Sequence, residues 1–550
     1  MLFRGNVRII LIASVVLVSC SANTRTSTNQ TSALAAKISG QCSKVQKPEL
    51  GKGTVCFDNG FRIARDDFSF ANWGRSSKAD ANVTVQTLID LFGHSAVCMP
   101  GPSNACVMRP ATIQKLEQWN TALAGGRCEG IATLSNRLYL TNDLPEDFAP
   151  GIQRVSDLHK TDGRLTQDIV KWWATQFLTE VVDRADESRA KSPLQLVDDL
   201  INGLSYKLGY TLGMYFGASG HSVVPFAVTQ RDDEFVIHVY DNNNPGERRE
   251  VLVNAVTNTW SFPRALTALD GSPIDWSGST GTLELVPMSA REGPFTCAFC
   301  NSTDSLQRVL TIASRDSQSP GYALVRTRSG KSLTVTPDAI SNSIPGATYE
   351  IGKGSANGVT TISIPESAGD FDVSIRRVTA EVPAGDVVVN LRRRGSADIQ
   401  IVGNLAESTI DGNDLGKALL AVRINDTTIH APHNSNARIS VAAGTNLSHT
   451  NLSPNSSLVV RAIHANAIEV SLKGANNTLA TTQFAANAST NVIESQWSLD
   501  SDQQFISTKE TLSAVSVNRR ALASFAPRQG AQTTTSTSMV PSSIVISRPD

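Results

Sequence analysis

The chain has 550 residues, of which 40% are hydrophobic, 18% are charged and only 6% are aromatic. At roughly 150 residues per domain, this length predicts three or four domains. The 49 basic residues nearly cancel the 50 acidic ones, so the net charge of −1 gives no electrostatic reason to expect a nucleic-acid partner. The sequence contains no cysteine after Cys300 and few aromatic residues there. This shift predicts chemistry in the first part of the chain and β-structure in the second.

The first twenty residues have the pattern of a secretory signal. Arg4 and Arg8 flank the start of a short apolar segment at 9–18, whereas a spanning helix needs about 20 residues. The sequence Leu-Val-Ser-Cys at 17–20 resembles the lipobox of bacterial lipoproteins, in which the peptide is cut before the cysteine. The resemblance implies a lipidated Cys20, and two or three acyl chains anchor a protein stably. We therefore expect the protein on the extracytoplasmic face of the outer membrane or at the cell surface. The alternative is an ordinary signal whose cysteine is incidental.

The eight cysteines can be sorted by parity and spacing. Export makes disulfide bonds their default state. If Cys20 is lipidated, an odd number remains, and Cys128 is left over as the free thiol once near neighbours are paired. A zinc site at Cys297 and Cys300 stays open as an alternative, although it would need ligands from distant loops. The candidate disulfides are Cys42 with Cys56, Cys98 with Cys106, and Cys297 with Cys300.

The chain before residue 290 contains both helical and β-like patterns. Apolar residues at helical spacing indicate helices, and Ser192 with Gln195 forms a capping box before one of them. Helices come before strands, which predicts an α+β domain rather than alternating βαβ units. Helices are predicted over 84–92, 112–123, 165–182 and 192–204, and a hairpin of strands over 221–228 and 235–241.

Three residues of this region form a candidate catalytic group. Cys128 follows the glycines at 125–126 and begins a predicted helix, where the positive end of the helix dipole favours a thiolate. His221 begins the first strand of the hairpin. A turn near 232–233 would bring Asp241 opposite this histidine, where a carboxylate accepts the second imidazole proton and fixes the tautomer. The sequence therefore predicts a nucleophile, a base and an orienting group in the order Cys, His, Asp.

This constellation resembles the papain-like cysteine peptidase superfamily. The motif Gly-x-Cys-x-Gly around Cys128, the segment Gly-His-Ser-Val-Val-Pro-Phe-Ala-Val at 220–228 and Tyr-Asp-Asn-Asn at 240–243 are similar to secreted bacterial members. Phe-Ala-Asn-Trp-Gly at 70–74 and the segment 294–300 belong to the same unit. The resemblance covers about 55–300. It implies an α+β papain-like fold with Cys128 as the nucleophile, His221 as the general base and later acid, and Asp241 as the orienting group.

One position departs from the papain-like pattern. Members often carry a glutamine six residues before the cysteine, where this chain has Ala122. Gln118 and Asn120 are the nearby amides, and neither is assigned to the oxyanion hole. The backbone N–H of Cys128, at the start of its helix, is the better donor.

Other residues of catalytic type lack suitable partners in the sequence. His238 alternates with Tyr240 and should face away from Asp241. His94 and His159 have no neighbours at metal-ligand spacing, and no phosphate loop or dinucleotide fingerprint occurs. We therefore expect no cofactor and no metal.

The chain after residue 300 has the pattern of β-modules. Short strands separated by Gly, Pro, Ser and Asn are typical of a β-sandwich, and such modules can bind a surface or partner, or space the catalytic domain. The predicted organisation is a signal peptide at 1–19, a lipidated Cys20 with a flexible tether at 20–40, the papain-like domain at 41–300, a sandwich-like module at 301–380, a second β-rich module at 381–525 and a disordered tail at 526–550.

These patterns together predict a surface-anchored thiol hydrolase that cleaves peptide or amide bonds through a thioester intermediate. Its partners would be a protein or peptide substrate and the membrane that holds the lipid anchor. Two alternatives stay open. One is a non-catalytic adhesin or binding lipoprotein on the same scaffold, and the other is a transglutaminase-like acyl transferase.

Overall fold

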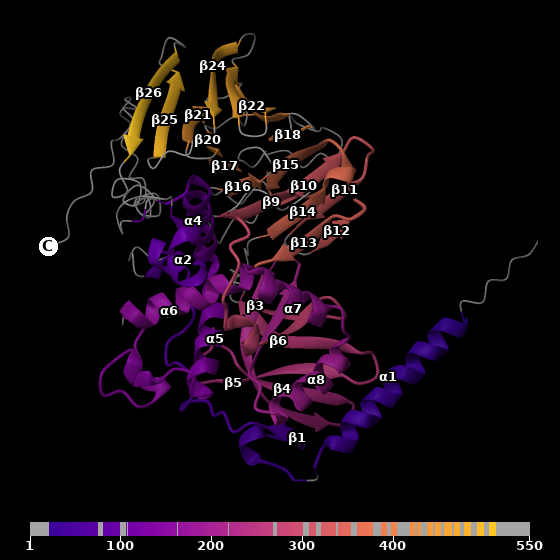
Figure 1. Ribbon diagram of the computed structural model, residues 1–550. Coiled ribbons are helices and arrows are strands. Elements are labelled where there is room, and N and C mark those ends of the chain that lie inside the picture. Colours follow the sequence, from indigo (N-terminus) through magenta and orange to yellow (C-terminus); the bar gives the residue numbers. More distant parts are fainter. Residues whose placement is uncertain are drawn as a thin grey trace, which may run out of the picture.

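In a computed structural model the chain forms two units, one before residue 300 and one after it (Figure 1). The first unit combines helices with an antiparallel sheet, and the second is built on two larger sheets, which confirms the predicted order of an α+β part and an all-β part. The signal, Cys20 and the tail at 526–550 lie outside the described residues. These residues are 21–512, apart from short gaps and the longer ones at 75–80, 99–105, 301–306, 315–320, 354–359, 378–386, 404–418, 431–436 and 486–491.

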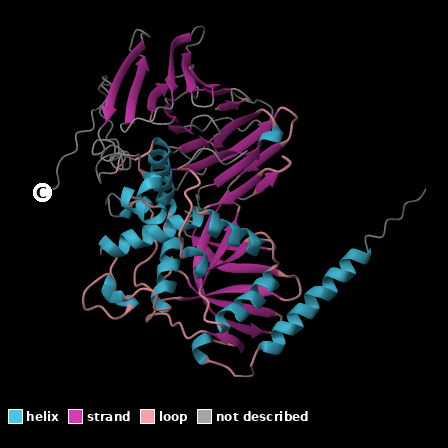
Figure 2. Cartoon of the chain, viewed as in Figure 1, coloured by secondary structure: helices cyan, strands magenta, loops and turns pink. Residues whose placement is uncertain are grey.

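Helix α1 (Ser21–Gln41) occupies the segment for which we predicted a flexible tether, so that prediction was wrong in its local structure. Figure 2 shows the helix extending away from the rest of the first unit. Its last turns have partners, because Lys37 pairs with Asp198 at 2.6 Å and Ile38 is buried. Among the helices that the structure describes, none has the length and apolar character needed to cross a bilayer.

Most other helices follow the apolar patterns of the sequence. The capping box of Ser192 and Gln195 is present at the start of α8 (Pro193–Ser205), and Thr84 caps α2 (Val85–Phe92) in the same way. The remaining helices of this unit are α3 (His94–Val97), α4 (Pro110–Ala122), α5 (Cys128–Tyr139), α6 (Gly163–Ala174) and α7 (Thr179–Arg189).

The helix predicted over 165–182 is interrupted between α6 and α7. The hydroxyl of Thr175 donates to the Trp172 carbonyl at 2.6 Å, and the amide of Gln176 donates to the Trp173 carbonyl at 3.0 Å. Side chains that bind nearby carbonyls in this way compete with the helical hydrogen bonds. The break places Gln176 in the interior of the unit.

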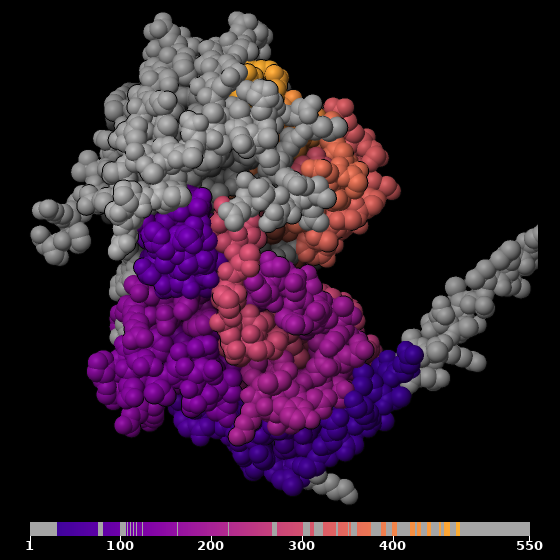
Figure 3. Space-filling model, viewed as in Figure 1, coloured from indigo at the N-terminus to yellow at the C-terminus, as the bar shows by residue number. Residues whose placement is uncertain are grey.

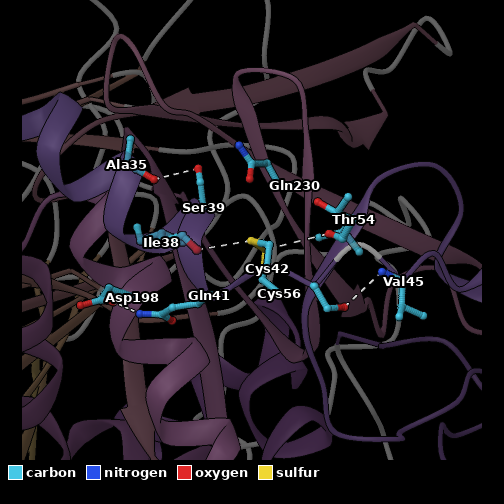
Figure 4. The surroundings of a disulfide bond; sticks show 12 residues. Ala35, Ile38, Ser39, Gln41, Cys42, Val45, Thr54, Cys56, Asp198 and Gln230 are labelled. Atoms are coloured by element: carbon cyan, nitrogen blue, oxygen red, sulfur yellow. Dashed lines mark hydrogen bonds between the residues drawn. A yellow bond between two sulfur atoms is a disulfide. The ribbon is translucent and has the colours of Figure 1, made fainter.

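The three predicted disulfides are confirmed. Cys42–Cys56 ties the end of α1 to β1 (Thr54–Asp58), as Figure 4 shows. Cys297 and Cys300 are bonded to each other, so this pair does not offer the thiolates of the alternative zinc site. Among the described residues Cys128 is the free cysteine, and it is buried. Cys128 is therefore the one thiol available for chemistry in the described chain, as predicted.

The Cys98–Cys106 disulfide lies beside a histidine that we expected to have no partners at ligand spacing. A ring nitrogen of His94 and the two sulfurs lie within 4.8 Å of one another. Sulfurs bonded to each other offer no thiolate, which is the form in which cysteine binds metals. The group is therefore a disulfide with a neighbouring imidazole.

The sheet of the first unit has the order β7-β6-β5-β4-β3-β2-β8, with β1 beside β3. The predicted hairpin is β3 (Ser219–Arg231) and β4 (Glu234–Tyr240), paired antiparallel. Helix α5 packs on this sheet, and Gly130 lets α6 come close, since a Cβ there would lie 1.9 Å from the Ile169 carbonyl oxygen. The other strands are β2 (Tyr210–Phe216), β5 (Arg248–Asn254), β6 (Thr259–Thr267), β7 (Pro273–Gly278) and β8 (Leu283–Pro287).

The second unit is one two-sheet sandwich and not the two modules that we predicted at 301–380 and 381–525. Each of its two nine-stranded sheets contains strands from both of the expected modules. A single apolar core extends from Leu310 to Leu472, across the expected boundary. The chain builds both sheets together by placing hairpins in one sheet and then the other. The space-filling view shows the first unit in indigo to rose and the described part of this unit in orange (Figure 3).

The strands of the sandwich fall into two sets. One sheet contains β10 (Gly321–Thr327), β11 (Ser332–Val335), β12 (Ile340–Asn342), β15 (Phe371–Arg377), β18 (Leu420–Val422), β19 (Asp426–His430), β22 (Ser457–His464), β23 (Ala467–Lys473) and β24 (Thr478–Ala485). The other contains β9 (Gln307–Ser314), β13 (Thr348–Ile351), β14 (Thr360–Pro365), β16 (Val387–Arg392), β17 (Asp398–Gly403), β20 (Ala437–Ala443), β21 (Asn446–Leu452), β25 (Val492–Leu499) and β26 (Phe505–Leu512). The first unit touches this second sheet through α4.

Candidate active site

Cys128 is the first residue of α5, as the sequence predicted. The chain reaches it through Gly126, whose φ of 137° is a conformation that residues with a side chain rarely adopt. The first N–H groups of a helix have no intrahelical acceptor and carry the positive end of the helix dipole. The thiol therefore lies where a negative charge on sulfur or on a nearby oxygen is stabilised.

His221 and Asp241 meet as predicted, with 2.8 Å between Nε2 and Oδ1. The histidine lies near the start of β3, and the aspartate directly follows β4. Asp241 occupies the Nε2 side of the ring, and the Cys128 thiol is a further side-chain partner of the imidazole that contributes to its raised pKa. The three side chains thus form one line of contact from sulfur to carboxylate.

The electrostatics of this line favour a protonated histidine. Burial alone would lower the pKa of His221, but the charge and hydrogen bond of Asp241, together with Cys128, outweigh burial and raise this pKa from 6.5 to about 10. Burial likewise disfavours the charge of Asp241, but His221 above all holds the pKa of this carboxyl below its usual range. An imidazolium beside the sulfur in turn favours the thiolate.

Three further groups hold the Asp241 carboxylate in place. The backbone N–H of Asn243 donates to Oδ1 at 2.9 Å, and the side-chain amide of Asn244 donates to Oδ2 at 2.7 Å. Arg249 lies 3.8 Å from Oδ2. Because the carboxylate is buried and its oxygens are bound on several sides, its orientation toward the imidazole is fixed.

Two asparagines that had no assigned role connect the segments of the site. Asn72 accepts the N–H of Arg127 on Oδ1 at 2.7 Å and donates from Nδ2 to the side-chain oxygen of Asn243 at 3.0 Å. Asn242 donates from Nδ2 to the carbonyl oxygens of Cys128, at 3.0 Å, and Ser222, at 2.9 Å. Each asparagine therefore joins the cysteine segment to the histidine–aspartate segment. The sequence signal for Asn72 was its place in the motif at 70–74.

Replacing Asn72 by alanine should loosen the junction between the cysteine and histidine segments. The change removes the acceptor for the Arg127 N–H and a donor to Asn243, and we expect kcat to fall roughly 10-fold to 100-fold, because small displacements of catalytic groups have effects of that size. KM should change by less than about threefold. Steady-state kinetics with Asn142→Ala, at an exposed bend of the same unit, as the control would measure this. Unchanged kcat would contradict the positioning role.

Arg127 fixes the turn before Cys128 from the interior. Its guanidinium donates to the carbonyls of Trp73, Gly74 and Ala81 and lies 5.1 Å from the centre of the Trp73 ring. Burial lowers the pKa of this arginine to about 9. Because Arg127 directly precedes Cys128, its side chain ties the loop at 70–74 to the start of α5.

Neither amide near the missing glutamine is an evident oxyanion donor. The side chain of Asn120 is bound through both its oxygen and its nitrogen to the backbone of Val83, at 2.6 and 2.8 Å. Gln118 accepts a hydrogen bond from Lys115 at 3.1 Å. The N–H of Cys128 thus stays the predicted donor for a developing oxyanion.

His238 belongs to the core and not to this group. Its Nε2 lies 3.0 Å from the Thr229 hydroxyl, and burial, followed by Arg248 and Arg231, lowers its pKa to about 4. A neutral imidazole bound to a hydroxyl is an ordinary core element.

The site thus brings together the three predicted residues and a backbone N–H donor. A nucleophilic sulfur, an acid–base imidazole and an orienting carboxylate are the groups needed to transfer an acyl group to sulfur and then to water or an amine. Cys128 and Asp241 are fully buried and His221 is 2% exposed, so the line of contact is closed to solvent in this structure. Comparison of the chain with models of protein families, with curated proteins and with solved structures finds no match.

Proposed function

We propose that the first unit is a thiol hydrolase of papain-like type that cleaves peptide or amide bonds. The observation that carries the proposal is the contact line from the Cys128 thiol through His221 to Asp241. The cysteine at the N-terminus of a helix packed on an antiparallel sheet, with the histidine on that sheet, supports the papain-like assignment.

The reaction would proceed in two acyl-transfer steps. The Cys128 thiolate attacks the carbonyl carbon, and the Cys128 N–H binds the oxygen on which charge develops. The C–N bond breaks as the amine takes a proton from the His221 imidazolium, which leaves a thioester. Water that gives its proton to the now neutral His221 then hydrolyses the thioester. Because Cys128 and His221 are closed to solvent, a substrate carbonyl reaches the sulfur only after the residues that cover this pair move.

Trapping the acyl group tests this reaction and separates it from acyl transfer. The full chain would be incubated with a pool of peptides, with and without hydroxylamine, and the products identified by mass spectrometry. A hydrolase should release free carboxylates in water, and hydroxylamine should intercept part of the thioester and give hydroxamates in place of some of the carboxylates. Hydroxamates or amides without hydrolysis would favour the transferase, and no products from any peptide would favour the binding protein.

We also propose that Cys20 carries a lipid anchor and holds the unit at the cell envelope. Cys20→Ser should abolish acylation, and the protein should leave the membrane fraction or accumulate with its signal uncut. The mass of the N-terminal peptide and the partition between membrane and soluble fractions measure these effects, with Ser19→Ala as the control. A wild-type N-terminal peptide without acyl mass, and unchanged partition of the variant, would exclude the anchor.

A further inference from the structure

The second unit places one lysine inside the first unit, next to the active site. Lys353 follows β13 in the connection to β14 and is 4% exposed. Its ammonium lies 2.5 Å from Oε1 of Glu284 and 3.3 Å from Oε2 of Glu129. Its backbone N–H donates to the side-chain oxygen of Gln176 at 2.5 Å. The lysine is thus held at its backbone and at its charged end by residues of the catalytic unit.

Both acceptors of Lys353 are carboxylates with no exposed surface. Arg291 pairs with Glu129, and Arg189 pairs with Glu284 and with the exposed Asp186. Three cations therefore face three carboxylates, and removal of the lysine would leave one negative charge in excess. The titratable and charged groups around Lys353 are Glu129 on α5, Glu284 on β8, Arg189 on α7, Arg291 after β8 and Tyr215 on β2.

Glu129 directly follows the nucleophile in the sequence and shares the first turn of α5 with it. Burial disfavours its charge, and Lys353, ahead of Arg291, holds the pKa of this carboxyl below its usual range. A buried carboxylate on the residue next to Cys128 disfavours a second negative charge on the sulfur unless its own charge is compensated. The lysine therefore acts on the same equilibrium as His221, through the charge of Glu129.

The segment that carries the lysine also approaches the histidine side of the site. The carbonyl oxygen of Gly352 lies 3.1 Å from the place where a Cβ would stand on Gly220. Gly220 directly precedes His221, so a side chain at this glycine would crowd the Gly352 carbonyl. Residues 352–353 thus contact residues adjacent to both members of the catalytic pair.

We propose that Lys353 is a positioning residue for the Cys128–His221 pair, so that the β-sandwich completes the active site of the first unit. Its ammonium compensates the charge of Glu129 and holds the first turn of α5, which preserves the reactive thiolate. This inference rests on the proposed thiol chemistry and deepens it. The sandwich is then part of the catalytic machinery and not only a spacer or a binding module.

The test is the pH profile of Cys128 alkylation in the full chain, measured with iodoacetamide on the peptide that contains Cys128. In Lys353→Met the uncompensated Glu129 should move the profile to higher pH by about one unit, so that alkylation at pH 6 slows roughly tenfold. Lys353→Arg keeps the charge and should keep the wild-type profile. Lys331→Met, at an exposed lysine of the same unit, is the matched control.

A charge rescue separates this role from simple loss of packing. The double variant Glu129→Gln/Lys353→Met removes one charge of each sign and should return the profile to within about threefold of the wild type at pH 6. Glu129→Gln alone should move the profile to lower pH, and it supplies the test if Lys353→Met does not fold. A Lys353→Met profile equal to the wild type, a double variant as slow as Lys353→Met, or an unmoved profile in Glu129→Gln would each overturn the proposal.

The outcome is distinguishable from failure of the thiol function itself. If His221→Ala shifts the profile and Lys353→Met does not, the role of Lys353 is wrong and the cysteine–histidine pair stands. If neither shifts it, the proposed function has failed. The expected result is a shift in both variants, larger for His221→Ala.

Discussion

Cys128→Ala is expected to abolish hydrolysis, with a loss of at least about 10⁴-fold in turnover, because removal of the nucleophile leaves only substrate binding and the N–H donor. The fold should survive, since alanine is a good helix residue and the change removes a single buried atom, at about 1–2 kcal/mol of unfolding free energy. Turnover of a cleaved peptide and the thermal midpoint, measured on the same sample, check both expectations.

Two further measurements make the Cys128→Ala result specific. Alkylation of the native, non-reduced chain should label the Cys128 peptide in the wild type and no other peptide of the residues that the structure describes, because their other cysteines form disulfides. Ser135→Ala, a similar deletion of a buried polar atom on the same helix, should keep most of the turnover. Hydrolysis that persists in Cys128→Ala would place the chemistry elsewhere.

The cysteine assignment could be read from the sequence because it depends on local spacing. The paired residues are separated by 14, 8 and 3 positions, and such pairs can be found without knowledge of the fold. The meeting of His221 and Asp241 was readable for a similar reason. A hairpin whose turn is short sets its own register, so the place of one strand's residues predicts their partners on the next.

Contacts between distant segments could not be predicted in this way. Lys353 lies between Gly352 and Gly354, a pattern typical of a solvent-exposed turn, and nothing local indicates two buried carboxylates as its partners. Asn72 was placed in the right unit, but its bonds to Arg127 and Asn243 depend on how the loops pack. The sandwich was divided wrongly because alternating strands reveal a buried face without indicating which of two sheets a hairpin joins.

His221→Ala should move the pH profile of Cys128 alkylation to higher pH than in the wild type. The raised pKa of His221, about 10, means that the wild type keeps an imidazolium beside the sulfur throughout the neutral range. A thiol without such a partner ionises near pH 8.5 and is thiolate in only about 0.3% of molecules at pH 6. Allowing for the weaker intrinsic reactivity of a stabilised thiolate, we expect roughly 100-fold slower alkylation at pH 6 and little difference at pH 10.

Hydrolysis and alkylation should diverge on the alkaline side of the wild-type profile. Above about pH 10 His221 loses its proton, and the leaving amine then has no acid to protonate it, so hydrolysis should fall. Alkylation needs only the thiolate and should stay fast. Parallel decline of both rates would indicate unfolding rather than titration of the imidazole.

His221 also makes the stability of the folded protein depend on pH, because its contribution is larger at low pH than at high pH. Because its pKa is raised from 6.5 to about 10 by folding, its stabilising contribution is fully present below pH 6.5 and is lost as the pH rises through about 10. His221→Ala lacks this contribution, so its deficit in thermal midpoint should be largest below pH 6.5 and should shrink toward pH 10. Gln230→Ala, on the same strand but exposed in part, should show a deficit that does not vary with pH. A pH-independent deficit in His221→Ala, together with an unchanged alkylation profile, would mean that the imidazole packs beside the thiol without activating it.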